Sequence, residues 1–290
     1  MRINKGISED RSKPLSLGGG WGHREPMSIV QLIEAGDLSA EVASLLWLVM
    51  SYRVSAISAA TPQMSGKSTM MNCLRDFVRP DENIYYLQGR FEDFSFLPST
   101  KPGNSVLLAE ELSDHTPSYV WGEGAQTLFS LLPEGYRLLS TMHASTAEEL
   151  LREISESLGT PIEQLERIGM IVNLAAGRRP PNVPKREGIP AGDRLYRLTM
   201  VSLIRRVKGD DQSLMIEPLA EWVMDKDEHT VNENAIKILS EYLDQPQSKL
   251  KKELATYSEA IQSFMAKGIR EPEKVRKAIL STYSAARKAS

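Results

Sequence analysis

The chain has 290 residues, of which 41% are apolar and 25% charged, and this composition is ordinary for a folded protein with a buried core. Thirty-five basic side chains against 38 acidic ones leave a net charge of −3, so the composition does not favour a nucleic-acid partner. The single cysteine, Cys73, excludes an internal disulfide, and we expect it to be buried rather than reactive.

The longest apolar stretch, residues 42–60, is interrupted by Arg53 and diluted by serines. It falls short of the roughly 20 clean apolar residues of a membrane span, and we expect a buried helix followed by a buried strand. Residues 1–26 are polar and glycine-rich, which predicts a disordered or extended segment without the apolar region of a signal peptide. These features predict a cytoplasmic protein, which could dock on the inner face of a membrane through a partner.

From residue 27 onward, short apolar runs alternate with helical patterns. Ser28 and Ser39 stand where N-caps of two helices are expected, and Gly36 stands where the first helix should end. Such alternation is typical of a parallel α/β sheet whose functional groups lie at the carboxyl ends of the strands. Strands are expected at 53–60, 83–87, 105–109 and 136–140, and further helices at 70–78, 124–132 and 147–158.

After Gly177 the chain changes character. The proline-rich, basic segment 178–193 predicts a loop, and residues 194–207 and 213–223 are expected to pair as strands that complete a core spanning 27–229. Residues 230–290 are expected to form C-terminal helices, with turns near Pro246 and Gly268.

The strongest functional motif is SGKST, at residues 65–69, between a predicted strand and a predicted helix. This is the context of a Walker A phosphate loop, because N–H groups and the dipole at a helix start attract phosphate. Lys67 is expected to reach the β- and γ-phosphates of ATP, and the Ser68 hydroxyl to bind Mg²⁺. The first motif glycine is absent. The predicted nucleotide-binding residues are Thr61, Pro62, Gln63, Met64, Ser65, Gly66, Lys67, Ser68 and Thr69.

Two later motifs also end predicted strands. In VLLAEE, residues 106–111, Glu111 is placed as in a Walker B motif to accept a proton from the attacking water, and also to hold Mg²⁺. In LLSTMHAST, residues 138–146, His143 is placed to bond the γ-phosphate or Glu111. Alone, a strand-end glutamate or a single histidine is ordinary, so both interpretations depend on the phosphate loop. The predicted catalytic residues are Glu111, Lys67 and His143.

With these motifs in order, the chain resembles the secretion-superfamily ATPases of type II and type IV secretion, type IV pili and archaeal flagella, over roughly residues 28–285. SGKST matches the Walker A segment of that family, AEELSD its Walker B segment, and LSTMHASTAEELL its His box. The segment FMAKGIREPEKVRKAILSTY is similar to the terminal helices of the pilus-assembly and archaeal branch. The resemblance implies a RecA-like P-loop NTPase core with a mostly parallel sheet. It also implies a hexameric ring that works on an inner-membrane platform protein.

The chain departs from the family pattern in its acidic box, which falls at residues 87–90 and holds Gln88 and Gly89. Glu92 and Asp93 lie close enough in the sequence to be considered as substitutes. Relatives also carry a whole N-terminal domain before the core, whereas about 26 residues precede the first predicted helix here. That domain is expected to be absent or supplied by another protein.

Arginines that act on the nucleotide of a neighbouring subunit are a further expectation from the resemblance. Arg90 lies in the altered acidic box, and Arg178 and Arg179 form a second candidate pair.

Three functions remain open at this point. The favoured one is an ATP-hydrolysing motor subunit of a type II secretion or type IV pilus-like system. The second is a nucleotide-binding regulatory or assembly subunit with weak or no turnover, which the depleted Walker A glycines and Gln88 would favour. The third, a nucleic-acid-dependent RecA-type motor, is disfavoured by the near-neutral charge and by the lack of an aromatic–basic stripe.

Overall fold

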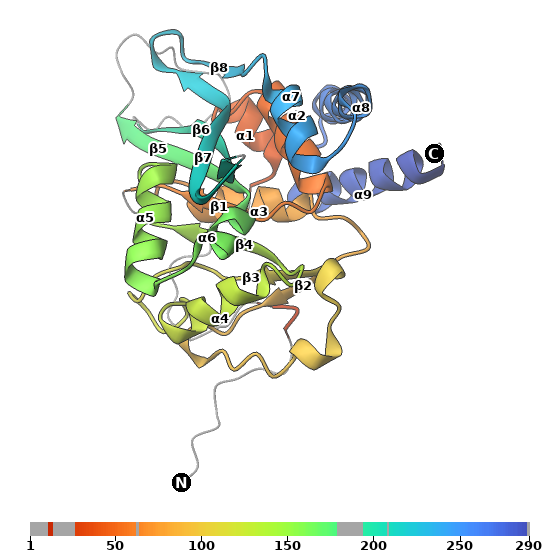
Figure 1. Cartoon of the computed structure of the whole chain (residues 1–290). Helices are drawn as coiled ribbons and strands as arrows, with labels where there is room; N and C mark the ends of the chain where they lie inside the picture. The colour runs from red at the N-terminus through yellow and green to blue at the C-terminus, as the bar shows by residue number, and fades with distance from the viewer. Residues whose placement is uncertain (1–10, 14–26, 62–63, 179–193, 208, 289–290) are drawn as a thin grey trace.

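A single mixed sheet organises the protein. The structure, a computed structural model, describes residues 11–13, 27–61, 64–178, 194–207 and 209–288, and within them one sheet has the strand order β2-β3-β4-β1-β5-β6-β7-β8 (Figure 1). Its strands are β1 (Ala56–Ala59), β2 (Asn83–Tyr86), β3 (Ser105–Leu108), β4 (Arg137–Met142), β5 (Met170–Arg178), β6 (Arg194–Val207), β7 (Asp210–Val223) and β8 (Glu228–Val231).

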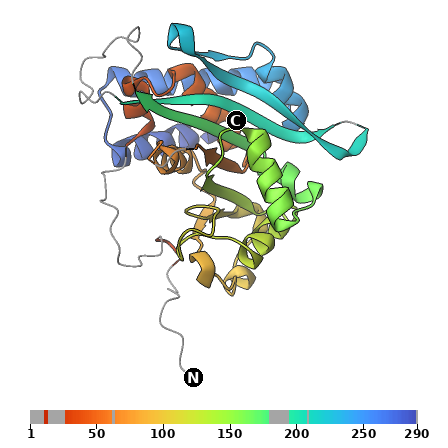
Figure 2. The same ribbon diagram turned by 90° about the vertical axis from the view of Figure 1, so that its left-hand side faces the viewer.

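The sheet is parallel in one half and antiparallel in the other. Strands β2, β3, β4, β1 and β5 run parallel, whereas β5, β6, β7 and β8 pair antiparallel. The long β6–β7 ribbon crosses one end of the molecule (Figure 2). The predicted parallel arrangement of the first four strands and the predicted pairing of the last long ones are both confirmed, while β5 and β8 were not predicted.

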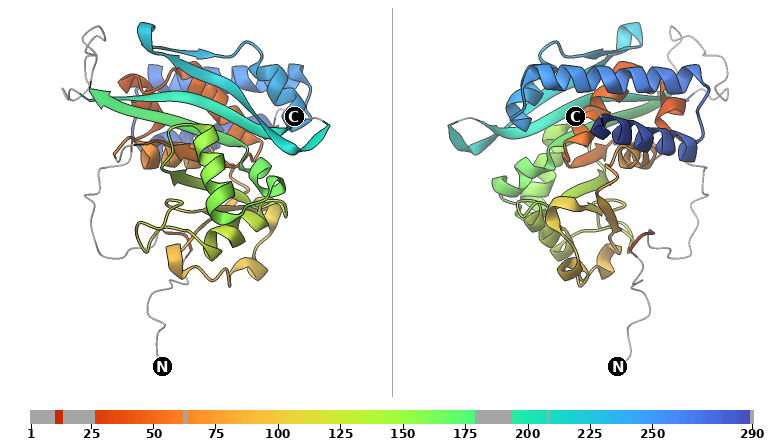
Figure 3. Two further views of the ribbon diagram at one scale, coloured as in Figure 1. Left: turned by 60° about the vertical axis from the view of Figure 1, so that its left-hand side comes forward. Right: turned by 90° about the vertical axis from the view of Figure 1, so that its right-hand side faces the viewer.

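Helices cover both faces of the sheet (Figures 1 and 3). On the first face lie α1 (Ile29–Ala35), α2 (Ala40–Ser51), α3 (Lys67–Asp76), α7 (Ala235–Leu243), α8 (Gln247–Ala266) and α9 (Pro272–Lys288). On the second face lie α4 (Glu123–Leu131), α5 (Ala147–Leu158) and the short α6 (Ile162–Leu165).

Strand residues supply both cores by alternation. In β3, Val106 and Leu108 join the first apolar cluster, whereas Leu107 between them joins the second. All four residues of β1 are buried, as a parallel strand covered on both faces requires. The predicted succession of a buried helix and a buried strand over residues 42–60 is therefore confirmed by α2 and β1. In the described part of the chain, no helix has the length and apolarity to cross a bilayer.

Local signals start and stop the first helices as predicted. The Ser28 hydroxyl accepts the Gln31 N–H at the start of α1, and Gly36 ends that helix in the left-handed conformation with φ 77°. The Ser39 hydroxyl caps α2 in the same way, through the Val42 N–H. These caps satisfy backbone groups that a helix cannot pair internally.

The C-terminal helices pack against α2 around one fully buried aromatic side chain. The Trp47 ring stacks on Phe77 and on Tyr257, with centroids 5.3 and 4.6 Å apart, and Tyr283 meets it edge-on. Helices α7, α8 and α9 thus share a core with the N-terminal helices, and the predicted boundary at residue 230 stays a prediction. Apart from 11–13 and 178, the predicted segments 1–26 and 178–193 lie outside the described residues.

Helix α9 also holds the end of α3. The Arg276 guanidinium donates to the carbonyl oxygen of Val78 at 2.7 Å and to that of Asp76, and the Tyr283 hydroxyl donates to the carbonyl of Phe77 at 2.6 Å. These donors satisfy carbonyl groups at the C-terminus of α3, where a cationic side chain is also favoured by the helix dipole.

Candidate functional site

Three loops meet at the carboxyl edge of the parallel strands. Strand β4 lies between β1 and β3, so the loops that follow these strands are neighbours. Lys67 is the first residue of α3, directly after the loop that follows β1, whereas the segment after β3 carries Glu111 and the loop after β4 carries His143. The structure therefore brings the three predicted catalytic residues together, although they are separated by up to 76 positions in the sequence.

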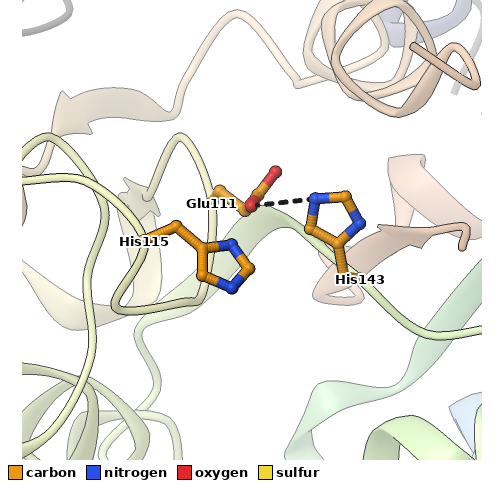
Figure 4. Close-up of side chains that lie close together, drawn as sticks. All are labelled: Glu111, His115 and His143. Carbon is orange, nitrogen blue, oxygen red and sulfur yellow. Dashed lines mark ion pairs between the residues drawn. The ribbon is translucent and has the colours of Figure 1, made fainter. Parts of the chain in front are cut away.

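The three side chains form a compact triangle. The Lys67 ammonium nitrogen lies 3.7 Å from Glu111 Oε2 and 3.3 Å from His143 Nε2. His143 Nε2 in turn lies 3.4 Å from Glu111 Oε1 (Figure 4). Lys67 and Glu111 are buried, whereas His143 is partly exposed. A charged lysine, a carboxylate and an imidazole thus share one small volume.

Hydroxyl groups hold the Glu111 carboxylate in place. Ser113 Oγ donates to Oε1 at 3.3 Å, and Thr141 Oγ1 lies 3.4 Å from Oε2. The backbone beside it is also fixed, because the Leu112 N–H donates to the Thr141 carbonyl at 2.8 Å. The carboxylate is therefore oriented by β4, the strand that carries His143 at its end.

Burial and crowding shift the ionisation of this cluster. Burial lowers the pKa of Lys67, and the nearby Glu111 carboxylate partly offsets that effect. Burial likewise lowers the pKa of His143, with Glu111 opposing the shift and the neighbouring Lys67 and His115 adding to it. Both cations are therefore easier to neutralise than in water.

A tyrosine and a second glutamate border the cluster. Crowding by protein atoms, and then repulsion from Glu111, raise the pKa of Glu110, although its side chain reaches solvent. Burial, followed by the charges of Glu111 and Glu110, raises the pKa of Tyr119 to about 12. Tyr119 therefore stays a neutral phenol beside the two carboxyl groups at physiological pH.

The predicted phosphate loop leads directly into α3. Gly66 is the N-cap residue with φ 92°, a left-handed conformation that favours glycine, and it has no side chain to cap the helix. Met64 also takes a left-handed conformation, with φ 63°. Within the described residues no side chain caps the first turn of α3, and its N–H groups can therefore bond an external acceptor such as a phosphate. The Ser68 side chain is exposed next to them.

Other predicted loop residues have different surroundings. The Thr61 hydroxyl, at the position of the first motif glycine, bonds to the hydroxyl of Ser145 in the loop after β4. Ser65 is buried, whereas Thr69 is partly exposed. Pro62 and Gln63 lie outside the described residues.

The acidic box region is organised around its own loop. Glu92 accepts the N–H groups of Gln88 and Phe94, each at 2.8 Å, and pairs with Arg11. Gly89 approaches the next loop so closely that a Cβ atom there would lie 2.3 Å from the Pro117 carbonyl oxygen. The bonds that Glu92 makes to Gln88, Phe94 and Arg11 stabilise this loop. They show that Glu92 is engaged here and is not part of the Lys67 cluster.

The candidate trans-acting arginines lie at the surface. Arg90 is exposed, and Arg178 is exposed at the end of β5. Arg179 lies outside the described residues. Their action on a neighbouring subunit stays a prediction.

Sequence reasoning missed His115, which lies in the loop between β3 and α4. Its ring centroid is 5.8 Å from that of His143. The residue follows Glu111 by four positions, but this spacing has no meaning outside a helix. A useful signal would have been the rarity of histidine, since the chain has four and two of them lie here.

No family model matches the chain. The uncharacterized protein MJ0900 of Methanocaldococcus jannaschii is 24% identical over 230 residues, which is 70% of this chain and 38% of that protein. The uncharacterized protein MJ1287 of the same organism is 28% identical over 165 residues, which is 49% of this chain and 61% of that protein. The chain thus spans less than two thirds of the length of either relative.

Two solved structures of secretion ATPases align with part of the chain at low similarity. The VirB11 ATPase of the Brucella suis type IV secretion system, in complex with sulphate, aligns with a TM-score of 0.36 and 17% identity, covering 52% of this chain and 55% of that one. The Legionella pneumophila ATPase DotB aligns with a TM-score of 0.31 and 13% identity, covering 81% of this chain and 62% of that one. Because both likenesses are slight, the function of this chain has to be inferred from its own side chains.

Proposed function

We propose that this chain binds ATP with Mg²⁺ at the start of α3 and hydrolyses it. In this proposal it is a RecA-like motor subunit of a type II secretion or type IV pilus-like system. The observation that carries the proposal is the meeting of Lys67, Glu111 and His143 beside a helix N-terminus that no described side chain caps. The strand order supports it, since β4 places the His143 loop between the phosphate loop and Glu111.

Phosphate binding would use groups already in place. The first N–H groups of α3 are directed out of the helix end, where they can donate to a phosphate. The helix dipole adds a positive potential there that favours the phosphate charge. Lys67, whose side chain is long and flexible, would turn from Glu111 and His143 toward the β- and γ-phosphates. The exposed hydroxyl of Ser68 would hold Mg²⁺ together with Glu111, and the ion when bound neutralises phosphate charge.

Hydrolysis needs a base and charge stabilisation. Glu111, held by Ser113 and Thr141, would take a proton from water as the water oxygen bonds to the γ-phosphorus. The bond between that phosphorus and the β–γ bridging oxygen breaks, and the N–H groups of α3 stabilise the charge that develops on ADP. His143 would contact the γ-phosphate or Glu111 and sense which nucleotide is bound.

Assembly is part of the proposal. A hexameric ring would place an arginine such as Arg90 or Arg178 of one subunit near the nucleotide of the next, and the ring would act on an inner-membrane platform protein from the cytoplasmic side. Mass photometry with Mg-ATP is expected to show particles of six times the 32.4 kDa monomer. Monomers alone at all nucleotide concentrations would contradict the ring.

The decisive experiment separates binding from turnover. Glu111→Gln is expected to reduce ATP hydrolysis by about 10²-fold or more while Mg-ATP still binds, because the general base is lost and the phosphate loop is kept. Lys67→Met is expected to lose nucleotide affinity. The exposed residue Glu259 provides a matched control, since Glu259→Gln removes the same charge from α8 and is expected to leave turnover unchanged.

The outcomes distinguish the alternatives. If the assembled wild-type protein binds ATP but does not hydrolyse it, the chain is a regulatory or assembly subunit. If turnover rises only when DNA or RNA is added, it is a nucleic-acid motor. If Glu111→Gln hydrolyses ATP as fast as the wild type, the proposed site is wrong.

A further inference from the structure

Two imidazoles and a carboxylate face one another beside the proposed nucleotide site. Glu111 and His115 come from the segment that follows β3, and His143 comes from the loop after β4. In Figure 4 the two rings lie on either side of the Glu111 carboxylate. Each residue offers one ligand atom, and these atoms all lie within 4.8 Å of one another. The proposed hydrolysis uses Glu111 and His143 but has no role for His115.

The spacing of these atoms approaches that of a metal site. Metal–ligand bonds of about 2.0–2.1 Å in tetrahedral geometry place neighbouring ligand atoms roughly 3.4 Å apart. His143 Nε2 and Glu111 Oε1 already have this separation, at 3.4 Å. The His115 ligand atom lies within 4.8 Å of the other two, and its exposed side chain can rotate toward them to reach bonding distance. The exposure of His115 also gives an ion access to the cluster from solvent.

The donor types select the class of ion. Two imidazole nitrogens and one carboxylate oxygen suit Zn²⁺ and its neighbours Co²⁺, Ni²⁺ and Cu²⁺, whereas Mg²⁺ prefers oxygen ligands throughout. The hydroxyls of Ser113 and Thr141, which bond the Glu111 carboxylate, supply the outer contacts that orient a metal-binding carboxylate. Glu111 would therefore bind Mg²⁺ together with Ser68, and an ion of the Zn²⁺ class together with His115 and His143.

Lys67 is the competing cation. Its ammonium nitrogen lies 3.7 Å from Glu111 Oε2 and 3.3 Å from His143 Nε2, so it contacts two of the three ligands. A metal ion bound there would be repelled by that charge, and the lysine has to turn away for the ion to bind well. Removing the lysine charge is therefore expected to strengthen metal binding.

We propose that Glu111, His115 and His143 form a binding site for a transition-metal ion of the Zn²⁺ class, and that the bound ion stops ATP turnover. The ion would bind the Glu111 carboxylate, which in the proposed reaction accepts a proton from the attacking water, and it would also bind the His143 imidazole. The inhibition rests on the proposed function, whereas the metal binding does not.

Metal binding is measured without nucleotide. Titration of the full chain with Co²⁺, followed by visible d–d absorption and by displacement with Zn²⁺, is expected to show one saturable site. His115→Ala, which removes one of three ligands from an exposed position, is expected to weaken binding at least about tenfold. Lys67→Met is expected to tighten it. His229→Ala is the matched control, because His229 lies in β8 and bonds the Leu198 carbonyl.

Two results would overturn the site. One is the lack of saturable Co²⁺ binding by the wild type, and the other is equal binding by the wild type and His115→Ala. Either result would leave the ATPase proposal intact, since neither depends on nucleotide.

Inhibition is measured at a fixed excess of Mg-ATP, with free Zn²⁺ set by a chelator buffer. Turnover by the wild type is expected to fall as the site fills, whereas His115→Ala keeps its full basal rate at the same free Zn²⁺. If Zn²⁺ fills the site without slowing turnover, the inhibitory role is wrong. If no preparation hydrolyses ATP, the proposed function fails and the Co²⁺ titration still decides the metal site.

Discussion

The start of β4 contains a buried ion pair that connects three elements. The Arg137 guanidinium donates to both carboxylate oxygens of Glu82, at 3.0 and 3.1 Å, and to the Val54 carbonyl at 2.8 Å. Both charged side chains are almost fully buried. Burial lowers the pKa of Arg137, and the Glu82 carboxylate opposes that shift. Each of the two buried charges needs the other as its partner, because either charge alone would be costly to bury.

Breaking this ion pair is expected to destabilise the folded protein strongly. Arg137→Met should lower the free energy of unfolding by about 3–5 kcal/mol, because the Glu82 carboxylate stays buried without its cationic partner and keeps only the Arg79 N–H. The double variant Arg137→Met/Glu82→Leu should recover most of that loss. Urea unfolding of the three proteins measures both effects. A loss below about 1 kcal/mol in the single variant would contradict the assigned burial of Glu82.

The lowered pKa of His143 predicts a pH dependence of stability. Below the ordinary histidine value of 6.5 the unfolded chain takes up a proton that the folded site resists, because of burial, Lys67 and His115. The contribution of His143 to the free energy of unfolding is therefore fully present above pH 6.5. It is lost as the pH falls from 6.5 through the lower pKa that His143 has in the folded protein. Denaturant titrations at pH 7.5 and 5.0 should show a smaller loss in His143→Gln than in the wild type. An equal loss in both would exclude this origin.

Helix α2 packs against its neighbours through a stack of aromatic rings. Trp47 is fully buried and contacts rings from α8 and α9 as well as Phe77. Trp47→Ala is expected to cost about 3–5 kcal/mol of unfolding free energy, since the cavity would separate α2 from the C-terminal helices. Trp47→Phe, which keeps a ring, should cost less. Chemical denaturation followed by circular dichroism measures both, and equal stability of the two variants would contradict the packing role.

Element prediction succeeded where the signal was local. Ser28 and Ser39 mark helix starts by their own side chains, and the buried runs of β1, β3 and β4 lie between clear turns. Strand β5 was not predicted, because a short apolar run alone does not identify a strand. Its strand character comes from pairing with β1 and β6, which are other segments of the chain. Strand β8 has three polar residues before Val231 and contains no strand pattern, and its pairing with β7 gives it strand character.

The same distinction applies to the site. Lys67, Glu111 and His143 could be predicted because each belongs to a motif at a strand end. His115 could not, because its position depends on the path of its loop, which Gly89 approaches at Pro117 and Leu112 ties to β4. Only the folded backbone brings that imidazole toward Glu111.

For the whole molecule, nucleotide binding is expected to raise thermal stability. A ligand at 100 times its Kd adds about 2.7 kcal/mol to the folded state, which corresponds to several degrees in Tm for a chain of this size. Differential scanning fluorimetry with Mg-ATP should show this shift in the wild type and in Glu111→Gln, but not in Lys67→Met. A shift that Lys67→Met retains would place the nucleotide elsewhere.

Helix α3 spans about 15 Å and is attached at its far end to α9 through Arg276 and Tyr283. Its near end is the one that would hold the triphosphate. The two helices are therefore joined by hydrogen bonds at the end of α3 that lies away from the proposed site. If the proposed site holds a nucleotide, a shift of α3 on release of the γ-phosphate would reach α9 through the Arg276 and Tyr283 hydrogen bonds.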